Sequence, residues 1–429
     1  MKEPTMQLIN NLNHEQIKVR LASLTELVRQ INSGELPVSK STGSVNNHIH
    51  TTYSFSPYSP TKAVWMAYNA GLTTAGIMDH DSISGAEEFT AAGKIISLAT
   101  TIGIECRADF SQTPLNGRLI NNPDQKSIAY LALHGIPHSQ IGKVTDFFTP
   151  YRQERNIRNQ KMVARLNDLF APHNIHLSFD QDVKPLSMAQ AGGSITERHI
   201  LFALAHKLIT TYGRGRVLVD FLKNTLKLEF GKKLEDYLLD SDNRYYPYDL
   251  LGVLKGDLVK AFYIPATAEC PDIRDVIRLS QEIGSISAYA YLGDVGDSVT
   301  GDKKSQKFED DYLDLLFAVL QDLGFNAITY MPSRNTLTQL LRLKSLCQQH
   351  GFFEISGEDI NSPRQSFICD ALLQKEFTNL IDSTWALIGH ERVATKDISQ
   401  GMFQPQAIAK YPELGDRIAY FKEIGRKQQ

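Results

Sequence analysis

Four residues, in three short motifs of the sequence, belong to the types that bind transition metals. His48 and His50 are separated by one residue, His80 is the centre of an Asp-His-Asp triplet, and Glu105 follows a Gly-Ile pair. Side chains on a strand alternate between its two faces, so the two histidines of a His-Ile-His segment share one side. Two imidazoles joined by a carboxylate from a neighbouring strand form a site for a divalent transition metal. Such a pair also occurs on surfaces and in hydrogen-bonded cores, and by itself it leaves both interpretations open.

Each of the three motifs follows a short apolar run. Val45 precedes the first motif, residues 74–78 precede the second and residues 100–104 precede the third. Short apolar runs that alternate with helical patterns indicate strands of a parallel sheet. In a parallel barrel the functional residues gather at the carboxyl ends of the strands. The order of the motifs therefore predicts that the histidines and Glu105 meet at one rim.

The same alternation continues along most of the chain and indicates an α/β fold. It stops near residue 140 and resumes near residue 272, so we predict a mainly helical insertion over 145–275. An amphipathic helix over 14–33 and a linker make up residues 1–44, and residues 45–144 and 276–429 form the main domain with C-terminal helices. We expect helices at 59–71, 87–98, 151–170, 194–209, 272–283, 311–323 and 337–350, two helices within 367–391, and late strands at 285–291, 326–330 and 352–356.

The three motifs, in this order, resemble the PHP family, named for the polymerase and histidinol phosphatase proteins that contain the domain. The likeness is continuous over about residues 46–105 and rests on His48-Ile49-His50-Thr51, Gly71-Leu72, Gly76-Ile77, Asp79-His80-Asp81-Ser82, Gly85 and Gly103-Ile104-Glu105. The resemblance implies a distorted seven-stranded (β/α)7 barrel, similar to a TIM barrel, with up to three divalent ions at the carboxyl ends of the strands. Most characterised members hydrolyse phosphate esters.

The resemblance also implies a set of metal ligands. His134 ends the next apolar run and is similar to the family's next histidine, although His138 is an alternative. Asp359 is similar to the aspartate of a late Gly-x-Asp-x-His motif, with Glu358 as the competing residue. Asp79 and Asp81 are expected to orient the intervening histidine and cap the next turn. The implied ligands are His48, His50, His80, Glu105, His134 and Asp359.

Three positions depart from the family pattern. Phe55 and Ser56 stand where an acid or histidine follows the first motif, Tyr289 stands near the expected late histidine, and Asn361 replaces the last histidine. Amide and phenol oxygens are poor ligands beside imidazole, and a phenyl ring cannot bind a metal. We therefore expect one or two divalent ions (Mn, Zn, Fe or Mg): one well-occupied ion at His48 and His50, a second of partial occupancy, and no third.

Arginines near the predicted rim are candidates for binding phosphate. Arg334 and Arg364 follow predicted late strands, and Arg198 lies in a Thr-Glu-Arg-His segment similar to one that many PHP proteins place over the substrate. His199 belongs to the same segment. The planar guanidinium group binds phosphate oxygens in pairs, which suits it to this role.

These residues together predict a metal-dependent hydrolase acting on a phosphate ester of a small molecule or nucleotide through a metal-activated water. In this interpretation Glu105 bridges two ions, with His134 on the second, and His80 is a ligand or the acid for the leaving oxygen. Arg198 and Arg334 neutralise the charge of the phosphate as it develops. The alternative is a degenerate PHP protein that binds a phosphorylated ligand without catalysis.

The composition is that of an ordinary globular chain. Of its 429 residues, 42% are hydrophobic and 22% charged, and 45 basic and 48 acidic residues give a net charge of −3. The four cysteines form no Cys-x-x-Cys pair and fit the reducing cytoplasm. No apolar run reaches the roughly 18 residues of a membrane span, and no basic block indicates nucleic acid. We expect a cytoplasmic protein with a small phosphorylated substrate and make no prediction of its oligomeric state.

Overall fold

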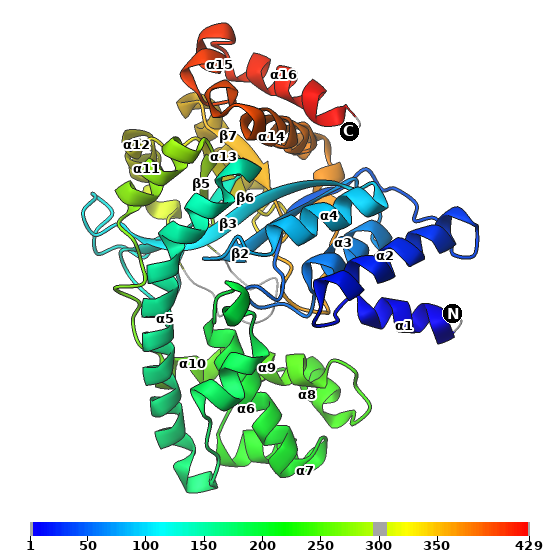
Figure 1. Cartoon of the computed structure of the whole chain (residues 1–429). Helices are drawn as coiled ribbons and strands as arrows, with labels where there is room; N and C mark the ends of the chain where they lie inside the picture. Colours follow the sequence, from blue (N-terminus) through cyan, green and yellow to red (C-terminus); the bar gives the residue numbers. More distant parts are fainter. Residues whose placement is uncertain (1–2, 295–306, 428–429) are drawn as a thin grey trace.

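The computed structural model describes residues 3–294 and 307–427. Its centre is a single seven-stranded sheet whose strands lie side by side in chain order (Figure 1). The chain thus has the α/β architecture that its alternating pattern predicts. The strands are β1 (Val45–Ile49), β2 (Thr74–His80), β3 (Ala99–Asp109), β4 (Ile128–His134), β5 (Ile286–Ala290), β6 (Ala327–Tyr330) and β7 (Phe353–Ser356).

The prediction of an all-parallel sheet is wrong at β4. Strands β1 to β3 are mutually parallel, as are β5 to β7, but β4 is antiparallel to both β3 and β5. Residues 110–127, which connect β3 to β4, form turns and no helix, so the chain returns beside β3 instead of crossing over. The carboxyl end of β4 consequently lies at the opposite edge of the sheet from the carboxyl ends of its neighbours.

The two edge strands approach each other next to the first histidine motif. Ile49 in β1 forms a parallel bridge with Ile360, which follows β7. The His50 N–H donates to the Ile360 carbonyl at 2.9 Å, and the Ile360 N–H donates to the His48 carbonyl at 3.1 Å. The sheet is therefore curled, and its edges meet at this bridge rather than along a continuous ladder.

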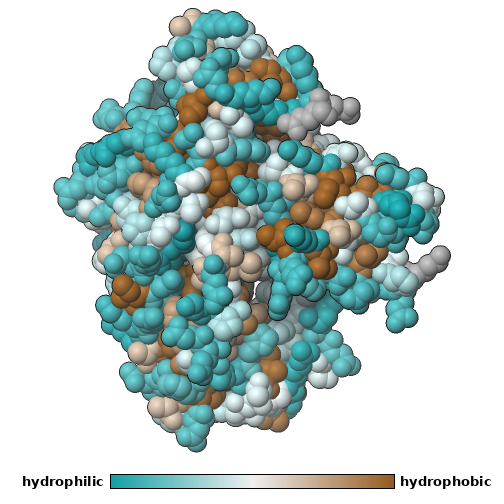
Figure 2. Space-filling model, viewed as in Figure 1, coloured by the Kyte–Doolittle hydropathy of each residue, from teal (hydrophilic) through white to brown (hydrophobic). Residues whose placement is uncertain are grey.

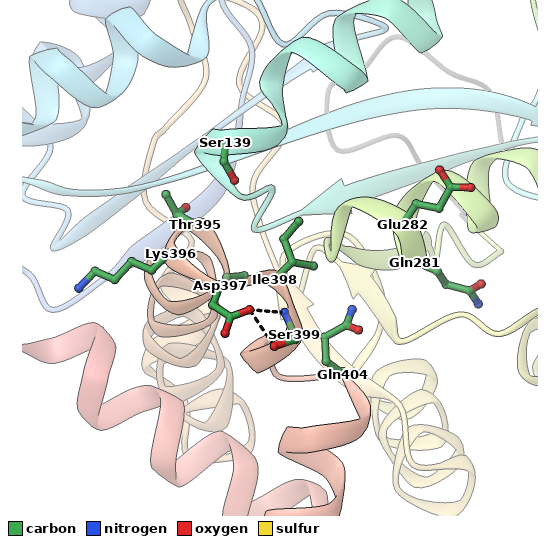
Figure 3. A pocket seen from close by; sticks show the side chains of 10 residues that line it. Ser139, Gln281, Glu282, Thr395, Lys396, Asp397, Ile398, Ser399 and Gln404 are labelled. Atoms are coloured by element: carbon green, nitrogen blue, oxygen red, sulfur yellow. Dashed lines mark hydrogen bonds between the residues drawn. The ribbon is translucent and has the colours of Figure 1, made fainter.

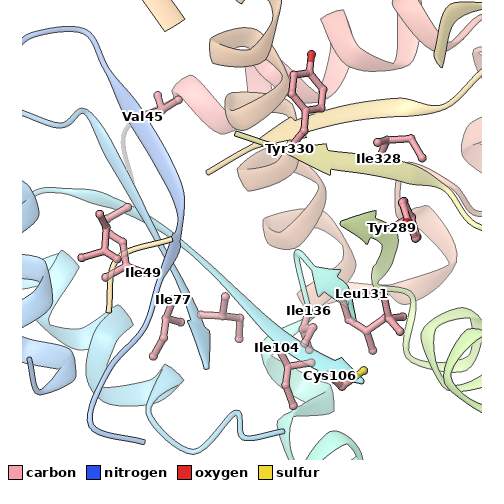
Figure 4. Close-up of a cluster of buried hydrophobic side chains, with 14 of the residues drawn as sticks. Val45, Ile49, Ile77, Ile104, Cys106, Leu131, Ile136, Tyr289, Ile328 and Tyr330 are labelled. Atoms are coloured by element: carbon pink, nitrogen blue, oxygen red, sulfur yellow. The ribbon is translucent and has the colours of Figure 1, made fainter. Parts of the chain in front are cut away.

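Helices cover the outer face of the sheet. Ser59 and Pro60 begin α3 as predicted, because the Ser59 Oγ accepts the Lys62 N–H and proline occupies the first helical position of Pro60–Asn69. Apolar side chains of six strands line this face (Figure 4), including Ile77, Ile104 and Ile328. The covering helices are α2 (Ile17–Asn32), α3 (Pro60–Asn69), α4 (Ala86–Ile96), α11 (Ile273–Ile283), α12 (Leu313–Leu323) and α13 (Leu337–His350), with α1 (Glu3–Asn11) packed on α2.

The C-terminal helices pack on the other face. Helix α14 (Asn379–Lys396) contacts β7, β3 and β1, and α16 (Leu414–Arg426) packs along α14. The short α15 (Pro405–Lys410) lies between them in the chain and at the same end of the molecule in Figure 1. Leu387 of α14 joins Ile286 and Phe353 in a buried apolar cluster. The middle of β1 is anchored here, since the Asn47 Nδ2 donates to the Thr384 Oγ1 at 2.8 Å. This packing supports the ends of the strands opposite the histidine motifs.

Between β4 and β5 the described chain forms helices and no strand. The long helix α5 (Ile141–Phe170) leads away from the sheet, and the remaining helices lie below the sheet in Figure 1. They share an apolar core of their own, to which Phe55 contributes from the loop after β1. The division of the chain into domains remains a prediction. These helices are α6 (Glu197–Tyr212), α7 (Arg216–Asp220), α8 (Lys232–Leu239), α9 (Tyr246–Asp257) and α10 (Val259–Phe262). Two of them, α6 and α10, contact α5, and the others pack on one another and on these two.

The face of the molecule in Figure 2 is mainly hydrophilic, with hydrophobic residues in scattered patches. Among the described helices, none combines the length and the apolar composition that a membrane crossing requires. Even α5, with 30 residues, carries charged side chains along its length.

Candidate metal centre

Five of the six predicted ligands lie together, around the ends of β1 and β2, the middle of β3 and the loop after β7. His48, His50 and Asp359 form one group, and His50, His80 and Glu105 form a second, with the ligand atoms of each group within 4.8 Å of one another. His50 belongs to both groups. Within the described residues these are the two sets of three or more metal-binding side chains, and together they form a single candidate centre.

Glu105 faces all three histidines. Its Oε2 lies 3.0 Å from the His80 Nδ1, 3.6 Å from the His48 Nε2 and 3.8 Å from the His50 Nε2. The sheet produces this arrangement directly, because His80 and Glu105 are register partners at the end of β2 and in the middle of β3. Burial favours the neutral acid, but His80 and His48 outweigh it and hold the pKa of Glu105 below its usual value. The carboxylate is therefore ionised and available to a cation.

Asp359 reaches the centre through the bridge between the sheet edges. The pairing of Ile360 with β1 puts the preceding residue beside His50, and the Asp359 Oδ1 lies 3.1 Å from the His50 Nε2. Burial opposes ionisation, but the contact with His50 and the nearby His48 hold the pKa of Asp359 well below its ordinary value. The centre thus contains two carboxylates and three imidazoles.

A chain of hydrogen bonds fixes the orientation of His50. The Ser54 Oγ lies 3.2 Å from the His50 Nδ1 and donates to the Asp79 Oδ1 at 2.6 Å. Asp79 also accepts the Thr51 N–H at 2.7 Å and the Thr51 hydroxyl at 2.6 Å. Since the serine proton points to the carboxylate, its oxygen accepts the proton of Nδ1 and leaves a lone pair on Nε2. Asp79 therefore orients His50, and not His80 as the sequence predicts.

Two imidazole nitrogens that face the carboxylates have no hydrogen-bond partner. The Nε2 atoms of His48 and His50 are buried and make no hydrogen bond of acceptable geometry, although carboxylate oxygens lie within 4 Å. Burial lowers the pKa of His50, which favours its neutral form. Burial also opposes the charged form of His48, but the carboxylate of Glu105 outweighs it and raises the pKa of His48. Buried polar atoms without a partner are costly, and a cation shared with the carboxylates would satisfy them. The donor set of imidazole and carboxylate fits a divalent transition ion.

His134 is not in either ligand group. In β4 the register partner of Glu105 is Ala132. Because β4 is antiparallel to β3, His134 lies two residues beyond Ala132 toward the start of β3, where it pairs with Ile286 at the start of β5. It is buried, and burial lowers its pKa to about 3. The alternative, His138, lies 2.8 Å from the Glu391 carboxylate of α14 and is outside the centre as well.

The positions that depart from the family pattern have other partners. Phe55 packs edge-on against His199 at 5.0 Å between ring centres, in the core of the helices after β4. Tyr289 points to the outer face of the sheet, where its hydroxyl donates to Glu309 at 3.1 Å. Tyr289 therefore cannot replace a ligand. Asn361 does lie at the centre, and its Nδ2 donates to the Asp359 Oδ1 at 2.6 Å.

Four predicted site residues are outside the ligand set: Arg198, His199, Arg334 and Arg364. Of these, Arg198 lies at the metal centre. Its Nη1 donates to the Asn361 Oδ1 at 2.6 Å. Arg364 is held by Asp249 at 2.7 Å and lies over the Tyr237 ring, so it anchors the late loop to the helices instead of binding phosphate. Arg334 lies in the turn after β6, where its N–H donates to the Met331 carbonyl, and its part in the site remains a prediction.

His199, from the same segment, caps a helix. Its Nδ1 accepts the Thr196 N–H at 3.0 Å, and burial lowers its pKa to about 3. The helix predicted from residue 194 begins later, because the cap is Thr196 and α6 begins at Glu197. A histidine three residues after the cap makes the bond that glutamate makes in the usual motif.

One group of functional interest was not predicted at all. Three arginines and three acids form a buried ionic network beside the centre; its members, here called the arginine network, are Asp81, Arg107, Arg155, Arg158, Glu197 and Glu269. Two signals were present in the sequence: Arg107 is two residues after Glu105 and so shares its face of β3, and Arg155 and Arg158 are one helical turn apart. Their acidic partners are distant in sequence.

Comparison with known proteins adds a weak likeness of fold. No protein-family model and no curated protein matches the sequence. The structure is similar to a candidate metal-dependent phosphoesterase from Bifidobacterium adolescentis, with a TM-score of 0.48 and 18% identity over 79% of this chain and 97% of that one. It is also similar to an amidohydrolase from Chromobacterium violaceum, described with bound sulfate and no metal, with a TM-score of 0.48 and 16% identity over 76% of this chain and 89% of that one. Likeness at this level assigns no activity.

A surface cavity of about 620 Å³ lies elsewhere, between the start of α5, the end of α11 and the end of α14 (Figure 3). Its lining includes Ser139, Glu282 and Lys396 and none of the candidate ligands. The cavity and the metal centre are therefore separate features.

Proposed function

We propose that this chain is a metal-dependent hydrolase of the PHP type that acts on a phosphate ester of a small molecule or nucleotide, and that its curled sheet is a distorted barrel. The observation that supports this proposal is the centre itself: five ligand residues from three neighbouring strands and one late loop converge within hydrogen-bonding or ion-pairing distance. Such convergence of costly buried groups is characteristic of functional sites.

The proposed ligands are His48, His50, Glu105 and Asp359, with His80 on the open side. A divalent ion held there supplies Lewis acidity and makes hydroxide available near neutral pH. The side chain of His80 is 26% exposed, against 1% for His50, so His80 is the imidazole best placed to give a proton to the leaving oxygen. We leave His134 out, and expect one principal ion and at most a weak second.

The proposed substrate anchor is Arg198. Its guanidinium lies at the rim of the centre, in contact with Asn361, and is half-buried. A guanidinium in this position neutralises a phosphoryl group that approaches the ligands, and stabilises the charge that develops during hydrolysis. Arg334 is proposed as a second anchor from the turn after β6.

The test is a screen of phosphate esters with protein supplied with manganese or zinc. On any substrate that the parent accepts, Glu105→Gln should abolish turnover while the circular dichroism spectrum stays unchanged, because a neutral amide binds cations poorly. His176→Gln, an exposed histidine in the helical region, is the matched control and should keep full activity. Full turnover by the Glu105 variant would refute the mechanism. Phosphate binding by the parent without any turnover would instead support the non-catalytic alternative.

A further inference from the structure

The arginine network begins next to the ligand His80. Asp81 has a left-handed backbone conformation, with φ of 50°, which is unfavourable for a residue other than glycine. Two arginines of α5 hold it there: Arg155 contacts its carboxylate at 2.9 Å, and Arg152 donates to its carbonyl at 2.8 Å. Its own N–H donates to the Glu105 carbonyl at 2.8 Å. Helix α5 thus fixes the backbone on both sides of the second ligand group.

From Asp81 the network continues into the helices after β4. Arg155 and Arg158 lie on one face of α5 and both contact Glu269, and Arg158 also contacts Glu197, the first residue of α6. Arg107 of β3 contacts the same two glutamates. The three arginines and Glu269 are at most 6% exposed, so the pairs are shielded from solvent and cannot be replaced by water at little cost.

The network ends at the other ligand group. Glu197 is adjacent to Arg198, whose Nη1 donates to Asn361, and Asn361 donates to Asp359. A continuous series of contacts therefore runs from His80 through α5 and α6 to Asp359, passing outside the metal centre and returning to it. Its charges balance within the protein, three positive and three negative, so the network is built to position groups rather than to bind an ion.

We propose that Glu197 is a positioning residue that holds Arg198 over the metal centre for an incoming phosphoryl group. This inference rests on the proposed function of the site. Glu197 can determine where Arg198 lies. Arg107 and Arg158 form ion pairs with its carboxylate, and its backbone begins the helix that contains Arg198. Without these ion pairs the first turn of α6 keeps its cap at Thr196 but loses the contacts that fix the position of Arg198.

The experiment is a double-mutant cycle read out by the binding of inorganic phosphate to the full-length, manganese-loaded protein. Arg198→Gln and Glu197→Gln should each weaken phosphate binding about tenfold, which corresponds to the loss of one good ionic contact. The double variant should bind no more weakly than Arg198→Gln alone, because Glu197 acts through Arg198. Manganese affinity, measured by titration, should change less than about twofold in every variant.

A matched control separates positioning from stability. Glu88 is another buried glutamate paired with an arginine, Arg20, on the outer helices. Glu88→Gln should lower thermal stability without changing the affinity for phosphate. Independent, additive losses in the two single variants would overturn the inference, as would a Glu197 variant with parental phosphate affinity or a parent that binds no phosphate. A parent that binds phosphate but hydrolyses no ester would refute the proposed hydrolase activity. The double-mutant cycle would still test the role of Glu197, because it measures phosphate binding and not turnover.

Discussion

The metal centre and the arginine network are two buried groups of charged side chains that balance their charges in different ways. In the network each of the three arginines contacts two of the three acids. In the centre, two buried imidazole nitrogens face carboxylates without a hydrogen bond. The network is closed at the level of ion pairs, although the buried Arg107 Nε makes no hydrogen bond. Paired charges of opposite sign support a structure, whereas imidazole nitrogens that face carboxylates can share a cation with them. The difference identifies which cluster supports the fold and which one binds.

The largest expected effect is on the network. Glu269 is 4% exposed and contacts all three arginines, so Glu269→Gln would leave buried positive charges without compensation. We expect the free energy of unfolding to fall by about 3–5 kcal/mol, the usual cost of breaking a buried ion pair. Urea denaturation of the metal-free protein measures it. A variant that unfolds like the parent but binds metal poorly would reverse the roles that we assign to the two clusters.

A smaller effect is expected on the metal affinity of the centre when the hydrogen bond that supports His50 is removed. Ser54→Ala removes the hydroxyl between His50 and Asp79 and frees the ring to choose its tautomer. Loss of such a supporting hydrogen bond typically lowers metal affinity by about tenfold or more, with the ligands still present. Calorimetric titration with zinc or manganese measures this change. Unchanged affinity would show that the hydrogen-bond chain does not orient the ligand.

The smallest effect concerns an ion pair that belongs to neither cluster. The hydrogen bond that His138 donates to the Glu391 carboxylate raises the pKa of this histidine, whose side chain is 36% exposed. A histidine with a raised folded-state pKa stabilises the protein fully below its unfolded pKa of about 6.5, and the contribution disappears as the pH rises through the folded-state value. His138→Gln should therefore cost less than about 1 kcal/mol near pH 6 and still less near pH 8. Melting curves at both pH values provide the measurement, and a larger loss at the higher pH would contradict the assignment.

The sequence predicted the centre well where local spacing determines geometry. His48 and His50 share a side because they are two residues apart, and parallel pairing of β2 with β3 then aligns His80 with Glu105. It did not anticipate the direction of β4, which depends on a connection whose turns carry no helical or strand period. His134 lies outside the two ligand groups, and its part in the site remains a prediction.

Contacts between residues distant in sequence were also beyond prediction. The partners of Arg155 and Arg158 lie in segments brought together only by the packing of α5, and nothing in the local pattern around Glu269 marks it as their acceptor. In the same way, Phe55 occupies a position where a ligand was expected because the loop after β1 also has to anchor the helical region. Long-range packing therefore decides which of the conspicuous residues reach the centre.

The central claim is that His50 is shared by both ligand groups of one metal centre. Its most direct test is metal analysis, together with zinc or manganese titration, of the parent and of His50→Ala, with His176→Ala as the exposed control. We predict one tightly bound equivalent in the parent and in the control, and none in His50→Ala, because that single change removes a ligand from each group. A parent that binds no metal, or a His50 variant that binds it as tightly as the parent, would contradict the account.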